Sequence, residues 1–223
     1  MVTGNENAER TAYLTFDDGP SSNTVQILNI LRQHNIPATF FVVGSESAFA
    51  KRMYQRIVDE GHALGNHTYS HDYEMIYQSA ENFMEDVVRM QDFLEGVTGT
   101  RPDVFRFPAG SNNQVHRQVQ SENPYIMVEI LEALRQKGLQ YFDWNVSSTD
   151  AAAITLETEF IIENTLNNIR GHRNAILLFH DSTPKTTTVE ALPVIIQSLK
   201  SQGYTFKPLT ADAFYVHFRH LVF

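Results

Sequence analysis

The stretch Thr11-Ala-Tyr-Leu-Thr-Phe-Asp-Asp-Gly-Pro20 determines how the rest of the chain is interpreted. Its apolar and β-branched residues up to Phe16 predict a strand, which the carboxylates of Asp17 and Asp18 and a Gly-Pro turn bring to an end. Successive side chains of an extended strand point in opposite directions, so the two aspartates can serve different tasks. One can bind a cation while the other stays free as a base. A plain Asp-Gly turn is the alternative.

The same alternation of strand and helix continues along the chain. Further strands are predicted at 38–43, 63–66, 104–107, 140–146, 175–179 and 204–208, and helices at 23–34, 47–60, 80–95, 125–137, 156–170 and 189–202. Residues 110–123 are polar and unpatterned, which predicts a long surface loop. About seven strand–helix repeats favour a parallel sheet in a closed or nearly closed (β/α) barrel. In such a barrel the chemistry lies at the carboxyl ends of the strands.

Length and composition limit the remaining classes of protein. The 223 residues fit one α/β domain at 11–210, with a polar segment at 1–10 and an aromatic tail at 211–223. This tail can pack on the barrel or contact a second copy. A net charge of -9 argues against nucleic-acid binding, and the absence of cysteine excludes thiolate ligands and nucleophiles. The sequence contains no run of about 18 apolar residues, so it predicts no membrane span. Nothing in the sequence sets an oligomeric state.

Two histidines, His67 and His71, follow the strand predicted at 63–66. Neutral imidazoles suit a zinc-like ion, and an aspartate completes a set of two histidines and one carboxylate with positions left for water. Two solvated histidines are the alternative, which the neighbouring Asp17-Asp18 pair disfavours.

Three more predicted strands end in polar groups. Arg106 begins the run Arg-Phe-Pro-Ala-Gly and can hold a carboxylate in its ionised form. Asp143 precedes Trp144, the only tryptophan. The alternatives are a helix N-cap for Asp143 and core packing for Trp144. His180 ends an apolar strand, where it can act as a general acid or pack in the core. Five strand ends with polar groups of these types indicate the rim of an active site.

The ordered set resembles the NodB-homology polysaccharide deacetylases, carbohydrate esterase family 4. The segments Thr15–Pro20 and His67–His71 are specific to it, and matching segments extend to His180. The resemblance implies a distorted (β/α) barrel with the following site residues: Asp18, His67 and His71 as metal ligands, Asp17 as general base, Arg106 positioning Asp17, His180 as general acid, Asp143 tuning His180, Ala109 donating its N–H to the oxyanion, and Trp144 and Leu178 walling the acetyl pocket. Ala109 stands where the family usually has a bulky aromatic residue.

The resemblance also implies an activity. It predicts hydrolysis of N-acetyl groups on N-acetylglucosamine units of a polysaccharide, by a metal-activated water with an Asp base and a His acid. Peptidoglycan is the preferred polymer, followed by chitin-like or poly-N-acetylglucosamine chains. Zn²⁺ is the expected metal, and Co²⁺ or Ni²⁺ would also fit. The alternatives are an acetylxylan O-acetyl esterase and a non-catalytic glycan-binding protein. The expected location is extracellular or at the cell surface, with any signal or anchor outside these residues.

Overall fold

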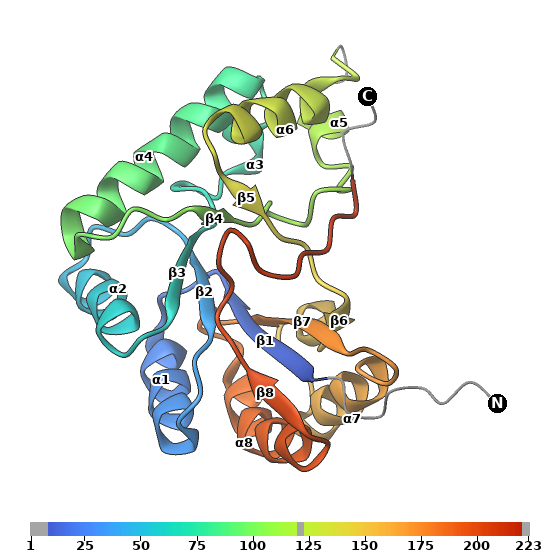
Figure 1. Cartoon of the computed structure of the whole chain (residues 1–223). Coiled ribbons are helices and arrows are strands. Elements are labelled where there is room, and N and C mark those ends of the chain that lie inside the picture. Colours follow the sequence, from blue (N-terminus) through green and yellow to red (C-terminus); the bar gives the residue numbers. More distant parts are fainter. Residues whose placement is uncertain (1–8, 120–122, 220–223) are drawn as a thin grey trace.

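A computed structural model describes residues 9–119 and 123–219 and shows a parallel, barrel-like sheet surrounded by helices (Figure 1). Most of the predicted 1–10 segment and the last four residues of the 211–223 tail therefore lie outside the described residues. The strands are β1 (Arg10–Asp17), β2 (Thr39–Val42), β3 (Ala63–Asn66), β4 (Val104–Phe105), β5 (Gln140–Tyr141), β6 (Val146–Ser147), β7 (Asn174–His180) and β8 (Tyr204–Phe206). Their order is β5-β4-β3-β2-β1-β7-β6, and β8 pairs with the start of β1. The predicted distorted (β/α) barrel is confirmed.

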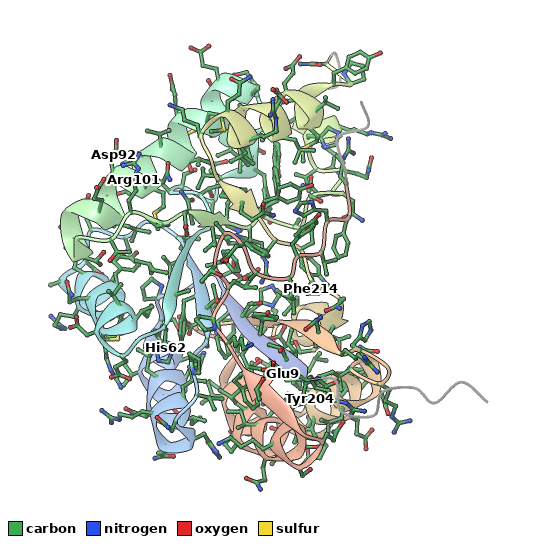
Figure 2. All side chains as sticks on the ribbon, viewed as in Figure 1. Glu9, His62, Asp92, Arg101, Tyr204 and Phe214 are labelled. Carbon is green, nitrogen blue, oxygen red and sulfur yellow. The ribbon has the colours of Figure 1, made fainter. Side chains whose placement is uncertain are left out.

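The connections between the strands are helical and cover the outside of the sheet (Figure 1). They are α1 (Ser22–His34), α2 (Ala48–Asp59), α3 (Tyr73–Ile76), α4 (Ala80–Thr98), α5 (His116–Val119), α6 (Ile126–Gln136), α7 (Thr158–Asn168) and α8 (Thr186–Ser201), with a 3-10 turn, η1 (Asp150–Ala152), after β6. On the outer face of α4, Arg101 donates to Asp92 over 2.6 Å (Figure 2). Within the described residues, no helix combines the length and apolarity needed to cross a bilayer.

The alternation of side chains along β1 places the first catalytic candidate inside the barrel. Leu14 and Phe16 face the core between the sheet and the helices, where the Phe16 ring stacks on Phe40 and Phe179 at 5.1 and 5.6 Å. Their neighbours on β1 point the other way, into the barrel. Asp17, the last residue of β1, therefore turns its carboxylate into the barrel.

The C-terminal segment fills the gap between the two edge strands, β5 and β6. Leu209 and Val216 join the small apolar cluster inside the barrel, together with Tyr13 of β1. Phe214 lies on the same segment where it passes the middle of the molecule (Figure 2). Asp143, after β5, donates its N–H to the Val216 carbonyl over 2.9 Å. The described part of the tail therefore packs against the barrel as an irregular segment.

Two predicted elements are wrong. The single strand at 140–146 is two short strands, β5 and β6, at opposite edges of the sheet. The chain crosses the barrel between them, so Asp143 does not stand at the end of a strand that continues to Val146. The polar run at 110–123 is not loop throughout, because it contains α5.

Candidate active site

Arg106 is fully buried, and its guanidinium faces the Asp17 carboxylate. Its Nη1 donates to Asp17 Oδ1 over 2.9 Å and to Thr15 Oγ1 over 2.6 Å. The remaining donors reach the backbone carbonyls of Phe142 and Asp143, at 3.0 and 3.3 Å. A buried guanidinium with such contacts holds the neighbouring carboxylate in one orientation and offsets the cost of burying its charge. The structure thus brings Arg106 and Asp17 together as the sequence predicted.

Asp18, His67 and His71 converge beside Asp17. The Nε2 atoms of both histidines lie 3.5 Å from Asp18 Oδ1, and one ligand atom from each of the three residues lies within 4.8 Å of the other two. Burial raises the pKa of Asp18, but the hydrogen bond and charge of His67, with the charges of two other histidines, bring it well below its usual range. Burial lowers the pKa of His71, which favours the neutral imidazole that a metal binds.

The tautomer of His67 supports a cation at this cluster. Its Nδ1 lies 2.8 Å from the Arg106 carbonyl, which only accepts hydrogen bonds, so Nδ1 carries the proton. In the neutral form of His67, which is the form that binds a metal, the Nε2 lone pair is then directed at Asp18 and His71. A histidine whose second nitrogen is fixed by a carbonyl is the usual arrangement of a metal ligand. The donor set therefore fits a divalent ion such as Zn²⁺.

His180 lies at the end of β7, directly beside Asp17 of β1 in the sheet register. Its Nδ1 is 2.7 Å from Asp150 Oδ1, and its backbone N–H donates to Asp150 Oδ2 over 2.8 Å. Thr188 of α8 donates to the same carboxylate oxygen. Burial lowers the pKa of His180, but the hydrogen bond and charge of Asp150, with the charges of Asp17 and Asp18, raise it to about 9. His180 is therefore protonated at neutral pH.

The predicted pairing of Asp143 with His180 is wrong. The Asp143 carboxylate accepts from the N–H and hydroxyl of Ser111, at 2.8 and 2.5 Å, and from the Phe218 N–H at 2.8 Å. Arg219 N–H in turn donates to the Ser111 hydroxyl. Asp143 thus ties the turn after Arg106 to the C-terminal segment. Asp150, which the sequence analysis did not single out, takes the place next to His180 because β6 ends just before it.

The remaining candidates line the same end of the barrel. Ala109 is exposed with a left-handed φ of 63°, and within the described residues no group accepts a hydrogen bond from its N–H. Leu178 lies two residues before His180 on β7, so their side chains share a face. Trp144 packs edge-on against Phe218, with ring centroids 4.9 Å apart, and closely approaches Gly110. A Cβ on Gly110 would lie 3.1 Å from the Trp144 ring.

Backbone strain gathers at this end of the barrel. The non-glycine residues with left-handed φ in the described chain are Asp18, Asn35, Thr68, His71, Ala109 and Thr149. All but Asn35, a helix C-cap, belong to the candidate site or are adjacent in sequence to a site residue. Strained conformations of this kind persist where the surrounding structure enforces them, and they concentrate in active sites.

Asp181 is a second residue that the sequence analysis left without a role. Its buried carboxyl accepts from Thr24 over 2.6 Å, and its N–H donates to the Asp17 carbonyl over 2.7 Å. Burial raises the pKa of Asp181 to about 7. A Cβ on Gly19 would lie 2.4 Å from Asp181 Oδ2, so the Gly19-Pro20 turn closes tightly over this group. Asp181 therefore supports the segment that carries Asp17 and Asp18.

Fold and site together define a hydrolase of the parallel (β/α)-barrel class, and sequence similarity identifies its family. The polysaccharide deacetylase profile matches residues 4–128. A peptidoglycan-N-acetylglucosamine deacetylase of Bacillus cereus is 31% identical, over 97% of this chain and 76% of that protein. A chitooligosaccharide deacetylase of Bradyrhizobium is 30% identical, over 92% of each protein. The catalytic domain of a peptidoglycan N-acetylglucosamine deacetylase from Eubacterium rectale superposes with a TM-score of 0.89 at 35% identity, covering 96% of this chain and 94% of that one.

The chain therefore belongs to the polysaccharide deacetylase family, carbohydrate esterase family 4, and is a polysaccharide deacetylase. Enzymes of this family are in general metal-dependent.

Proposed function

We propose that the protein removes N-acetyl groups from N-acetylglucosamine units of peptidoglycan, with chitin-like and poly-N-acetylglucosamine chains as the next candidates. The observation that carries this proposal is the placement of a base and an acid around one ligand cluster. Asp17, held by Arg106, and His180, held by Asp150, are register partners on neighbouring strands, and Asp18, His67 and His71 lie beside them. Amide hydrolysis needs a base for the water and an acid for the amine.

The residues divide the chemistry between them. A divalent cation held by Asp18, His67 and His71 would polarise the acetyl carbonyl and lower the pKa of a water molecule. Asp17 accepts the proton that this water loses as it forms a bond to the carbonyl carbon. The Ala109 N–H donates to the developing oxyanion, and one such donor is worth about 3 kcal/mol in other hydrolases. His180 gives its proton to the nitrogen as the C–N bond breaks, leaving acetate and a glucosamine unit.

Direct attack by water is consistent with the absence of nucleophilic motifs from the sequence. It has no cysteine and no Gly-x-Ser-x-Gly turn, so no residue is set up to form an acyl-enzyme. Leu178 and Trp144 are proposed to wall the acetyl group, since Leu178 shares the face of His180 and Trp144 lies against the turn that carries Ala109.

Relatives named as peptidoglycan deacetylases support the choice of polymer and a location outside the cell or at its surface. Zn²⁺ is the proposed metal, because two imidazoles and one carboxylate with positions left for water suit its coordination.

The test measures acetate released from peptidoglycan, an N-acetylglucosamine hexamer and acetylxylan, with Asp17→Asn as the matched inactive variant. The proposal predicts release from the first two substrates that depends on Asp17. Release from acetylxylan alone would instead favour an O-acetyl esterase. Binding of all three without release would favour a glycan-binding protein.

A further inference from the structure

Lys185, directly before α8, is a buried lysine with only 7% of its surface exposed. Its ammonium donates to three backbone carbonyls, those of Asp150 and Ala153 over 2.7 Å and that of Ile154 over 3.1 Å. An ammonium has three N–H groups and no acceptor, so these contacts use every donor that it has. The three carbonyls belong to η1 and the two residues that follow it. Lys185 therefore holds the segment that begins with Asp150.

The cost of burying this charge indicates what the lysine does. A buried ammonium is unfavourable unless hydrogen bonds replace those that it made with water. The acceptors of Lys185 are main-chain carbonyls, so its bonds fix the path of a backbone. That path is strained where it begins, because Thr149 enters η1 with a left-handed φ of 63°. A β-branched residue keeps this conformation only where surrounding contacts enforce it. Lys185 supplies such contacts.

The backbone that Lys185 holds carries the carboxylate that holds His180. Thr188, three residues further along, donates to Asp150 Oδ2 over 3.0 Å. The start of α8 thus fixes Asp150 twice, at its carbonyl through Lys185 and at its carboxylate through Thr188. The other carboxylate oxygen lies 2.7 Å from His180 Nδ1. Because hydrogen bonds weaken steeply when they are misaligned, a displaced η1 would weaken the hold on the imidazole.

We propose that Lys185 is a positioning residue for deacetylation, which keeps the Asp150 carboxylate aligned with His180 by holding the backbone of η1. This inference rests on the proposed function, in which His180 gives its proton to the departing nitrogen. The ammonium is fully used by the three carbonyls and is not free to bind glycan or metal. Its loss should therefore slow the chemical step and leave the binding of substrate and metal as they are.

The test compares Lys185→Met, which keeps the length of the side chain and removes its donors, with Lys200→Met as the matched control. Lys200 also donates to a backbone carbonyl, that of His34 over 2.6 Å, but from the last turn of α8. At pH 8, Lys185→Met should lower kcat for the N-acetylglucosamine hexamer by roughly tenfold, the scale of a small misplacement in an active site. KM and the affinity for Zn²⁺ should not change. Lys200→Met should match the wild type.

A double-mutant cycle with Asp150→Asn separates positioning from a general loss of stability. If Lys185 acts through Asp150, Lys185→Met should cost less than about twofold in kcat once Asp150 has been replaced. An equal loss in both backgrounds would overturn the proposal, because the lysine would then act independently of Asp150. Urea unfolding establishes that each variant is folded. If Lys185→Met does not fold, Lys185→Gln, which keeps an amide donor, should show the same pattern with a smaller loss.

The proton NMR signal of His180 Nδ1–H tests the inference without catalysis. A proton shared between an imidazole and a carboxylate resonates downfield of the backbone amides, and Asp150→Asn assigns the signal by removing it. We expect this signal to shift or disappear in Lys185→Met and to stay in place in Lys200→Met. A changed signal with a normal kcat would overturn the role of His180 in the proposed function, but not the positioning of Asp150. An unchanged signal would overturn the positioning by Lys185, whatever the rate.

Discussion

Replacing Asp150 with Asn should change the pH dependence of the enzyme more than its architecture. In the wild type, the carboxylate lies 2.7 Å from His180 Nδ1, and the pKa of His180 is raised from its usual 6.5 to about 9. At about 1.36 kcal/mol per pH unit, this corresponds to a preference of roughly 3 kcal/mol for the protonated form. Without Asp150, burial, the largest influence on this imidazole, is opposed only by the charges of Asp17 and Asp18, so the pKa of His180 should fall toward its usual value.

The expected effect can be followed in the rate. At pH 8 a group with a pKa of 9 is mostly protonated, whereas one with a pKa of 6.5 is protonated to only a few per cent. Acetate release from an N-acetylglucosamine hexamer should therefore fall roughly thirtyfold at pH 8 if His180 is the general acid. The alkaline limb of the pH profile of kcat/KM should move down by about 2.5 pH units.

Asp143→Asn is the matched control, because Asp143 is equally buried but contacts Ser111 and Phe218 instead of His180. It should lower the rate by loosening the turn at Ala109 while leaving the alkaline limb in place. An unmoved limb in Asp150→Asn, or an equal displacement in Asp143→Asn, would refute the pairing of Asp150 with His180.

The same pair should make stability depend on pH. The folded-state pKa of His180 is raised, so its contribution is fully present below about pH 6.5 and is lost as the pH rises through about 9. In urea unfolding, the stability difference between wild type and Asp150→Asn should therefore be up to about 3 kcal/mol larger at pH 6 than at pH 9.5. A difference that does not change with pH would contradict this linkage.

Three further substitutions test the site. Asp17→Asn should keep Zn²⁺ binding but reduce acetate release by about 10² to 10⁴, and loss of the metal instead would mean that Asp17 and Asp18 have exchanged roles. His180→Ala should slow hydrolysis of an acetamide more than that of an acetate ester, because an alkoxide leaves more easily than an amine anion; equal losses would count against a general acid. Arg106→Ala leaves the buried Asp17 charge without its partner. In urea unfolding, the free energy of unfolding should fall by about 3 to 5 kcal/mol, and a loss below about 1 kcal/mol would show that the pair contributes little to stability.

Much of the site could be predicted because parallel strands bring their carboxyl ends to one edge. Asp17, Asp18, His67, Arg106 and His180 all lie at or just after a strand end, so locating the strands located them. Their mutual distances follow from the sheet order, in which β1 lies between β2 and β7. The predicted strands, together with the rule that active sites lie at the carboxyl ends of parallel strands, were sufficient to locate these residues.

The partner of His180 was missed because it depends on a break between two short strands, β5 and β6. Residues 140–146 are apolar or aromatic enough to suggest one strand, and nothing local shows that β5 and β6 lie at opposite edges of the sheet. The polar run from Ser147 to Asp150 was the local sign that a second strand ends at about Val146. Applied there, the strand-end rule would have selected Asp150 in place of Asp143.

Contacts between distant segments were also beyond the sequence. Asp181 bonds Thr24, and the C-terminal segment reaches Ser111, across 157 and 108 residues. Such contacts depend on how the barrel closes, which periodicity along the chain does not encode. The aromatic composition of the tail left open whether it packs on the barrel or contacts a second copy.

The central claim, that Asp18, His67 and His71 hold a metal needed for deacetylation, is tested most directly by removing and restoring the metal. Acetate release from the hexamer would be measured after EDTA treatment and again after Zn²⁺ or Co²⁺ is added, alongside His71→Ala. We predict that chelation abolishes release, that either ion restores it in the wild type, and that neither ion restores it in His71→Ala, which should also show no stoichiometric Zn²⁺ binding by calorimetry. Full release from a metal-free wild type, or metal-restored release from His71→Ala, would contradict the account.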